Sequence, residues 1–136
     1  WVSAYQITPQ HESIYYFDYA QMATPRPESR NQTVSSGNNI TLNGKTLATV
    51  GAGLTFQNST GGIQSRSASS LDEVTIPPTD GYITTPLTVQ QSQLYLTRTI
   101  DNGTNYYGKI FVRSLSGTSS ATVDYAIQTS GNILSY

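Results

Sequence analysis

The strongest constraint on the fold is an alternation of apolar and polar residues in the last third of the chain. Three runs carry it, over residues 93–100, 106–115 and 121–129, and glycine-containing turn segments separate them. Successive side chains of a β-strand point to opposite faces, so a period of two predicts strands with one face turned to the core. Because the connections are short, we expect these three strands to form an antiparallel meander.

The alternation also assigns side chains to faces. The residues that we expect to point inward are Leu94, Leu96, Ile100, Ile110, Val112, Val123, Tyr125 and Ile127. On the opposite faces we expect Lys109, Phe111, Arg113, Thr122, Asp124 and Gln128. Arg98 and Lys109 fall on adjacent strands near two acids, Asp101 and Asp124, which predicts exposed cross-strand ion pairs.

The rest of the chain is also typical of β structure. Asn43-Gly44 is the strongest two-residue hairpin signal, and Ser13–Ala20 is rich in strand-forming aromatic residues. Residues 21–38 hold two prolines and no periodicity, which predicts a long loop, and an extended segment is expected over residues 71–76. We find no apolar period of 3.6. The sequence therefore predicts one all-β domain over residues 1–136, an antiparallel, Ig-like or jelly-roll-like sandwich with little or no helix.

Composition restricts the functions open to this chain. Charged residues make up 11% of its 136 residues, the net charge is −1, and there is no cysteine. A nearly neutral chain lacks the basic surface that binds nucleic acid, and no apolar run is long enough for a membrane-spanning helix. Without cysteine there is no disulfide, thiolate metal site or cysteine nucleophile. Seventeen Ser, 19 Thr and ten Tyr take the place of the usual Lys and Glu surface.

A motif order in the second half resembles small β-rich domains of secreted and surface bacterial proteins. It consists of Pro77-Pro78, Gly81-Tyr82, Tyr95-Leu-Thr-Arg98-Thr99, Tyr107-Gly-Lys109-Ile110 and Tyr125-Ala-Ile-Gln128. The likeness covers about residues 70–130, and Gln93 stands where those domains usually have a turn glycine. The resemblance implies a β fold and an extracellular or cell-surface location. It implies no activity, because most such domains have none assigned.

No set of residues predicts an enzyme. His11, the single histidine, lies in a polar segment beside Glu12, and nothing in the sequence places it next to a nucleophile. The acids are typical of turns or strand surfaces, except Asp18 in its aromatic run. Asp72 and Glu73 could converge with Asp80 on calcium, but turn chemistry is the favoured interpretation. We therefore expect no catalytic residues, cofactor or metal site.

Two surface features bear on glycans. Tyr15, Tyr16, Tyr106 and Tyr107 could form a platform on which sugar rings stack, although a core or interface role is favoured. Four N-x-Ser/Thr acceptor sequences for N-linked glycans lie in or beside predicted turns, where the acceptor must be accessible. Their asparagines are Asn31, Asn39, Asn58 and Asn102.

The N-terminal segment suggests self-assembly. Trp1, Tyr5 and Ile7 share one face of a possible strand within residues 1–10. Such a strand must bury that face, either on its own chain or in the sheet of a neighbouring copy. With two lysines in the whole chain, edge strands lack their usual protection. We therefore predict a secreted, pilus-like structural subunit that pairs with copies of itself, with a carbohydrate-binding or adhesive surface module as the alternative.

Overall fold

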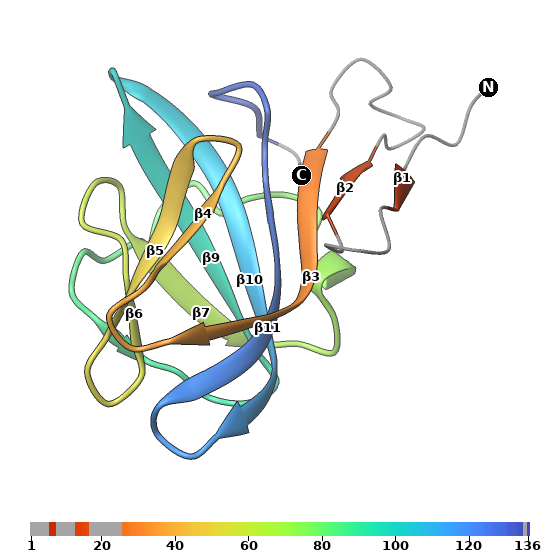
Figure 1. The fold of residues 1–136 in the computed structure, drawn as a ribbon. Coiled ribbons are helices and arrows are strands. Elements are labelled where there is room, and N and C mark those ends of the chain that lie inside the picture. The colour runs from red at the N-terminus through yellow and green to blue at the C-terminus, as the bar shows by residue number, and fades with distance from the viewer. Residues whose placement is uncertain (1–5, 8–12, 17–25, 135) are drawn as a thin grey trace.

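The computed structural model describes residues 6–7, 13–16, 26–134 and 136, which form two antiparallel sheets packed face to face (Figure 1). The sheets have the strand orders β1-β2-β3-β11-β10-β9-β7 and β4-β5-β6-β8. The strands are β1 (Gln6–Ile7), β2 (Ser13–Tyr16), β3 (Arg26–Ser35), β4 (Asn39–Leu42), β5 (Lys45–Gly51), β6 (Thr55–Gln57), β7 (Ile63–Ser67), β8 (Leu87–Thr88), β9 (Gln93–Asp101), β10 (Thr104–Ser116) and β11 (Ser120–Ile127). The prediction of an all-β sandwich is confirmed.

Turn chemistry explains why the best-predicted hairpins form. Asn43 and Gly44 join β4 to β5 with φ of 54° and 73°, and Asn102 and Gly103 join β9 to β10 with φ of 52° and 75°. Positive φ at both central residues is the geometry that matches strand twist, and Asn-Gly adopts it at low cost. Strands β9, β10 and β11 are consecutive neighbours, so the predicted meander is confirmed.

The main core lies between the two sheets. From the long sheet it receives Tyr95, Ile110, Val112, Val123 and Ile127, and from the short sheet Ile40, Leu47, Val50 and Phe56. The rings of Phe56 and Tyr95 meet edge to face, with centroids 5.0 Å apart. This edge-on arrangement is the favoured geometry for two aromatic rings and links the sheets at the centre of the sandwich.

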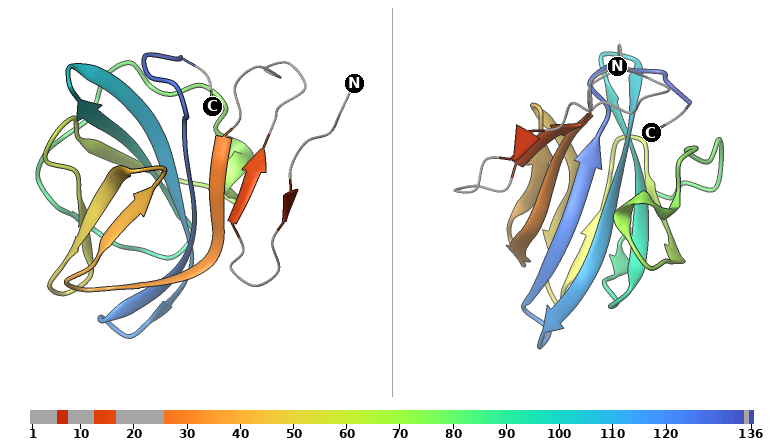
Figure 2. Two further views of the ribbon diagram at one scale, coloured as in Figure 1. Left: turned by 45° about the horizontal axis from the view of Figure 1, so that its top comes forward. Right: turned by 90° about the vertical axis from the view of Figure 1, so that its right-hand side faces the viewer.

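The far face of the long sheet is also covered. Residues 68–86, which we call the strap, cross that face between β7 and β8, and a short 3-10 helix, η2 (Leu71–Glu73), forms part of it. Figure 2 (right) shows the strap in green on one side of the blue strands and the short sheet on the other. Beneath the strap lies a second cluster: Leu71, Val74, Leu94, Leu96, Tyr107, Phe111, Ala126 and Tyr136.

Three sequence predictions about the long sheet and the strap are wrong. Leu94 and Leu96 point into it, away from the main core, because Leu94 lies opposite Phe111 and Leu96 opposite Lys109 across β9 and β10. Ile100, expected inside, is exposed near the end of β9. The segment expected to be extended over residues 71–76 contains the 3-10 turn of η2.

A further correction concerns residues 21–38, predicted to be a loop. Residues 26–35 are strand β3, which lies between β2 and β11. Pro27 cannot donate a ladder hydrogen bond, and it is tolerated because it is the second residue of β3, before the pairing with β11 begins at Glu28. The sequence of β3 shows no apolar and polar alternation, because one of its buried residues is the charged Glu28. Glu28 lies on the same face of the sheet as Ala126.

Candidate functional site

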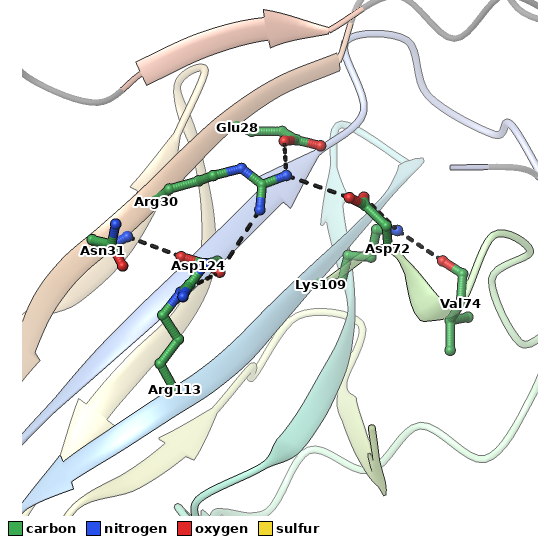
Figure 3. A network of polar contacts seen from close by, with 8 residues as sticks. All are labelled: Glu28, Arg30, Asn31, Asp72, Val74, Lys109, Arg113 and Asp124. Carbon is green, nitrogen blue, oxygen red and sulfur yellow. Dashed lines mark hydrogen bonds and ion pairs between the residues drawn. The ribbon is translucent and has the colours of Figure 1, made fainter. Parts of the chain in front are cut away.

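The most unusual feature of the described residues is a group of charged side chains between the strap and the long sheet (Figure 3). This polar network contains three carboxylates and three cations: Glu28, Arg30, Asp72, Lys109, Arg113 and Asp124. They come from β3, η2, β10 and β11. Glu28, Lys109 and Asp124 are almost completely buried, which is rare for charged residues unless they are paired.

Asp124 lies where both neighbouring strands depart from regular pairing. Its Oδ1 accepts a hydrogen bond from the Asn31 backbone N–H at 2.9 Å, and its Oδ2 accepts one from Arg113 Nε at 2.6 Å. Arg30 and Asn31 both fall opposite Asp124 in a β-bulge of β3, and Arg113 is the extra residue of a bulge in β10. Asn31 has φ of 55° there. The carboxylate therefore satisfies a backbone donor that the bulge turns away from the ladder.

Arg30 connects the strand bulge to the strap. Its Nη2 lies 2.7 Å from Glu28 Oε2 and 3.4 Å from Asp72 Oδ2, and its Nη1 lies 3.8 Å from Asp124 Oδ2. Burial opposes the charge of the guanidinium, but the combined attraction of the three carboxylates outweighs it and raises the pKa of Arg30. Arg30 is therefore held as a permanent cation between three acids.

Lys109 crosses the second cluster instead of lying on an exposed surface. Its ammonium donates to the Val74 carbonyl at 2.7 Å, lies 4.0 Å from Asp72 Oδ1, and stands 4.5 Å from the centroid of the Tyr136 ring. A buried ammonium needs such partners because its desolvation is costly. Lys109 therefore holds the strap against β10.

The predicted exposed ion pairs of Arg98 and Lys109 are wrong. Arg98 donates from Nε and Nη2 to the Gly61 carbonyl, at 3.1 and 2.9 Å, and its guanidinium lies over the Tyr82 ring, 4.6 Å from the centroid. Asp101 is paired with Lys45, at 3.7 Å. The long cations of the outer face are used to attach loops to the sheet, because the strap covers that face.

The polar network is suited to holding strands together. Its three carboxylates and three cations balance, and its two most buried acids already accept hydrogen bonds from arginines. Within residues 26–134 and the other described positions, no three His, Cys, Asp or Glu residues gather to hold a metal ion, so Asp72, Glu73 and Asp80 do not converge on calcium. His11, Glu12 and Asp18 lie outside the described residues.

At the N-terminal edge, β1 and β2 extend the long sheet beyond β3. Ile7 lies opposite Ile14, and β2 pairs with β3 through four residue pairs, from Ser13 with Ser29 to Tyr16 with Arg26. Trp1 and Tyr5, the other members of the predicted self-assembly strand, lie outside the described residues. The paired part of the N-terminal segment is thus a short addition to the edge of β3.

The tyrosines predicted to stack on sugars do not form an open platform where they are described. Tyr107 is 5% exposed and lies in the second cluster. It therefore lacks the exposed ring face that sugar stacking requires, and the prediction is wrong for Tyr107. Tyr106 is half-buried, packs against the main core and carries Lys45 Nζ 4.6 Å from its ring centroid. Tyr15 and Tyr16 belong to β2, and the prediction now depends on them.

The four glycan-acceptor asparagines divide into two kinds. Asn31, Asn39 and Asn102 are exposed, and whether they carry glycans stays a prediction. Asn58 is 4% exposed, and its amide nitrogen donates to the Leu47 carbonyl and to Thr99 Oγ1. The prediction of an accessible acceptor is therefore wrong for Asn58, because a sequence motif does not reveal which way a turn residue points.

Comparison with known proteins adds no relative: no family model, curated protein or solved structure matches the chain. Among the described residues, no helix is long and apolar enough to cross a membrane. The functional argument therefore depends on the chain's own geometry.

Proposed function

We propose that this protein is a non-enzymatic, extracellular structural subunit that assembles with copies of itself into a filament, sheath or layer by β-strand addition. The observation that carries the proposal is the attachment of β1 and β2. Their backbone pairing reaches the rest of the sheet through four residue pairs between β2 and β3. A strand pair held at a sheet edge in this way can be supplied by the same chain or by a neighbouring copy with the same hydrogen bonds.

The connection between the strands is long enough for exchange. Nine residues, 17–25, separate the end of β2 at Tyr16 from the start of β3 at Arg26. Nine extended residues span about 30 Å, roughly the width of a small domain. The tether length therefore permits β1 and β2 to pair with β3 of an adjacent subunit.

The composition supports association over solubility as a single molecule. With 11% charged residues and two lysines in 136, the chain has few of the charges that prevent edge-to-edge pairing. Because each subunit would donate one edge and accept at another, the contact is heterologous and can repeat into an open polymer. An extracellular location remains part of the proposal through the resemblance to secreted and surface domains.

A cysteine cross-link distinguishes the two sources of β2. Ser13 and Ser29 are register partners, and the natural chain has no cysteine, so Ser13→Cys with Ser29→Cys introduces one defined pair. After assembly and oxidation, exchange gives a ladder of covalent multimers on non-reducing gels. Monomers alone would mean that β2 pairs within its own chain and would overturn the proposal.

A matched pair controls for random cross-linking. Ser116 and Ser120 are register partners across the β10–β11 hairpin, so Ser116→Cys with Ser120→Cys forms its disulfide within one chain and stays monomeric. Deletion of residues 1–16, which removes both β1 and β2, gives an independent test. We expect it to abolish assembly and leave a folded, aggregation-prone monomer, and intact polymers from the shortened chain would contradict the proposal.

A further inference from the structure

Asn58 connects the two sheets of the sandwich. It lies between β6 of the short sheet and β7 of the long sheet, where the chain crosses from one layer to the other. Its Nδ2 donates to the Leu47 carbonyl of β5 at 2.8 Å and to Thr99 Oγ1 of β9 at 2.9 Å. One amide group thus uses both of its N–H bonds, one toward each sheet.

The oxygen of the same amide is equally occupied. Asn58 Oδ1 accepts hydrogen bonds from Thr60 N at 3.1 Å, Thr60 Oγ1 at 2.9 Å and Gly61 N at 3.1 Å. Thr99 Oγ1 in turn donates to the Thr46 carbonyl at 2.7 Å, which fixes its hydroxyl as an acceptor for Asn58. A buried network in which every donor has a partner specifies one geometry and tolerates no change in the donor set.

We infer that the folded domain excludes covalent modification of the Asn58 amide, although Asn58-Ser-Thr60 is an N-glycan acceptor sequence. In N-glycosylation by a lipid-diphosphate oligosaccharide, Nδ2 bonds to C1 of the sugar, the C1–O bond to the diphosphate breaks and one amide proton leaves. The modified nitrogen keeps one N–H, so either Leu47 or Thr99 loses its donor. The sugar must also occupy space between packed sheets.

Hydrolysis of the amide has the same consequence. Water adds to the side-chain carbonyl, ammonia leaves, and the resulting aspartate has no N–H to donate. Its carboxylate then faces the carbonyl of Leu47, which places two acceptors against each other in a buried site. The domain therefore matures with Asn58 unmodified, and any N-linked glycan that it carries is on Asn31, Asn39 or Asn102, all exposed. This inference does not depend on the proposed assembly function.

The first test replaces the amide by a carboxylate of the same shape. We expect Asn58→Asp to lower the melting temperature by about 10 °C or more, since it leaves two buried acceptors without donors. Asn39→Asp and Asn102→Asp make the same chemical change at exposed sites, and we expect them to shift the melting temperature by about 2 °C or less. Equal shifts for all three variants would overturn the inference.

The second test uses glycosylation directly. The chain is expressed in a eukaryotic secretory host, and glycan occupancy of each acceptor is mapped by mass spectrometry in the protease-resistant fraction. We expect Asn58 to be unoccupied in that fraction, and protease-resistant chains with a glycan on Asn58 would overturn the inference.

A second variant separates the acceptor sequence from the hydrogen bonds. Ser59→Pro abolishes the acceptor sequence and keeps Asn58 and Thr60, and proline is generally favoured directly after an Asn that begins a turn, as Asn58 does. We expect this variant to fold with a melting temperature within about 2 °C of the natural chain. A loss of 10 °C would mean that the turn backbone, and not the amide, controls stability here.

Discussion

The two faces of the long sheet are both covered, but by different means. The face toward the short sheet is closed by apolar side chains such as Phe56, Ile110 and Val123. The face toward the strap combines a smaller apolar cluster with the polar network, in which Lys109 and Arg30 reach across to Val74 and Asp72. Apolar contact is nondirectional, whereas each polar contact needs one partner at one distance. The packing on the face toward the short sheet is therefore specified by the apolar pattern of the sequence. The packing on the face toward the strap is specified by particular pairs of polar residues.

The largest effect is expected at the main core. Phe56 is fully buried between the sheets, so Phe56→Ala leaves a cavity and lowers the free energy of unfolding by about 3–5 kcal/mol. Ile100→Ala, at an exposed position of β9, should change it by less than about 1 kcal/mol. Urea unfolding followed by circular dichroism measures both. Similar losses would mean that the two sheets are not packed as described.

The polar network provides the next test. Asp124→Ala removes the acceptor shared by Asn31 N–H and Arg113, and we expect a loss of about 2–4 kcal/mol in the free energy of unfolding. Arg113→Ala removes only the partly exposed partner and should cost less. If the order were reversed, Asp124 would not be the centre of the two bulges.

A pH dependence tests the burial of a tyrosine in the strap. Burial, with a smaller contribution from Tyr107, raises the pKa of Tyr82, whose hydroxyl donates to the Pro78 carbonyl at 2.8 Å. The folded state therefore favours the neutral phenol, and this contribution to stability is complete below the unfolded pKa of about 10 and is lost as the pH rises above it. Tyr82→Phe should make stability less sensitive to pH between about 10 and 11.5.

The control for this prediction is the same pair of proteins, the variant and the natural chain, at neutral pH. At pH 7.5 the variant reports only the lost hydrogen bond, and the difference between its stability and that of the natural chain should narrow as the pH rises. Urea midpoints of the variant and of the natural chain, at pH 7.5 and at about pH 11, provide the measurement. A constant difference would show that the hydroxyl of Tyr82 is not buried between the strap and the sheet.

The smallest effect is expected for a surface pair. Asp101 is 57% exposed at the side chain and lies 3.7 Å from Lys45 Nζ. Exposed pairs contribute little because water screens them, so Asp101→Asn should change the free energy of unfolding by less than about 1 kcal/mol. A larger loss would show that the carboxylate also fixes the Asn102-Gly103 turn.

Sequence predicts the first face far better than the second. Period-two alternation and two Asn-Gly turns predict the meander, the inward faces of β10 and β11 and the β4–β5 hairpin, since these depend on local chemistry. The inward face of β9 is not predicted, because Leu94 and Leu96 point into the second cluster. Strand β3 was missed because its buried face carries Glu28, and a charged residue there breaks the apolar pattern. The two acids that Arg30 of the same strand reaches outside β3, Asp72, 42 residues later, and Asp124, are far away in sequence.

The candidate site residues show the same difference between what local sequence predicts and what distant residues determine. Asn58 and Tyr107 both appeared as surface candidates in the sequence, and both are buried because residues distant in sequence enclose them. One signal was available for the polar network: Glu28 and Arg30 are two residues apart, the spacing of one strand face, in a chain with few charges. That spacing predicts a shared face but not the acids that complete it.

The strap also determines the order in which the chain can fold. Between β7 and β9, which are neighbours in the long sheet, the chain crosses the far face and then adds β8 to the short sheet. Neither sheet is complete until this excursion has been made, whereas β9, β10 and β11 can pair through short turns. Contacts between residues far apart in sequence slow folding, so refolding on the millisecond-to-second scale of all-β proteins is expected, with the meander formed before the edges close.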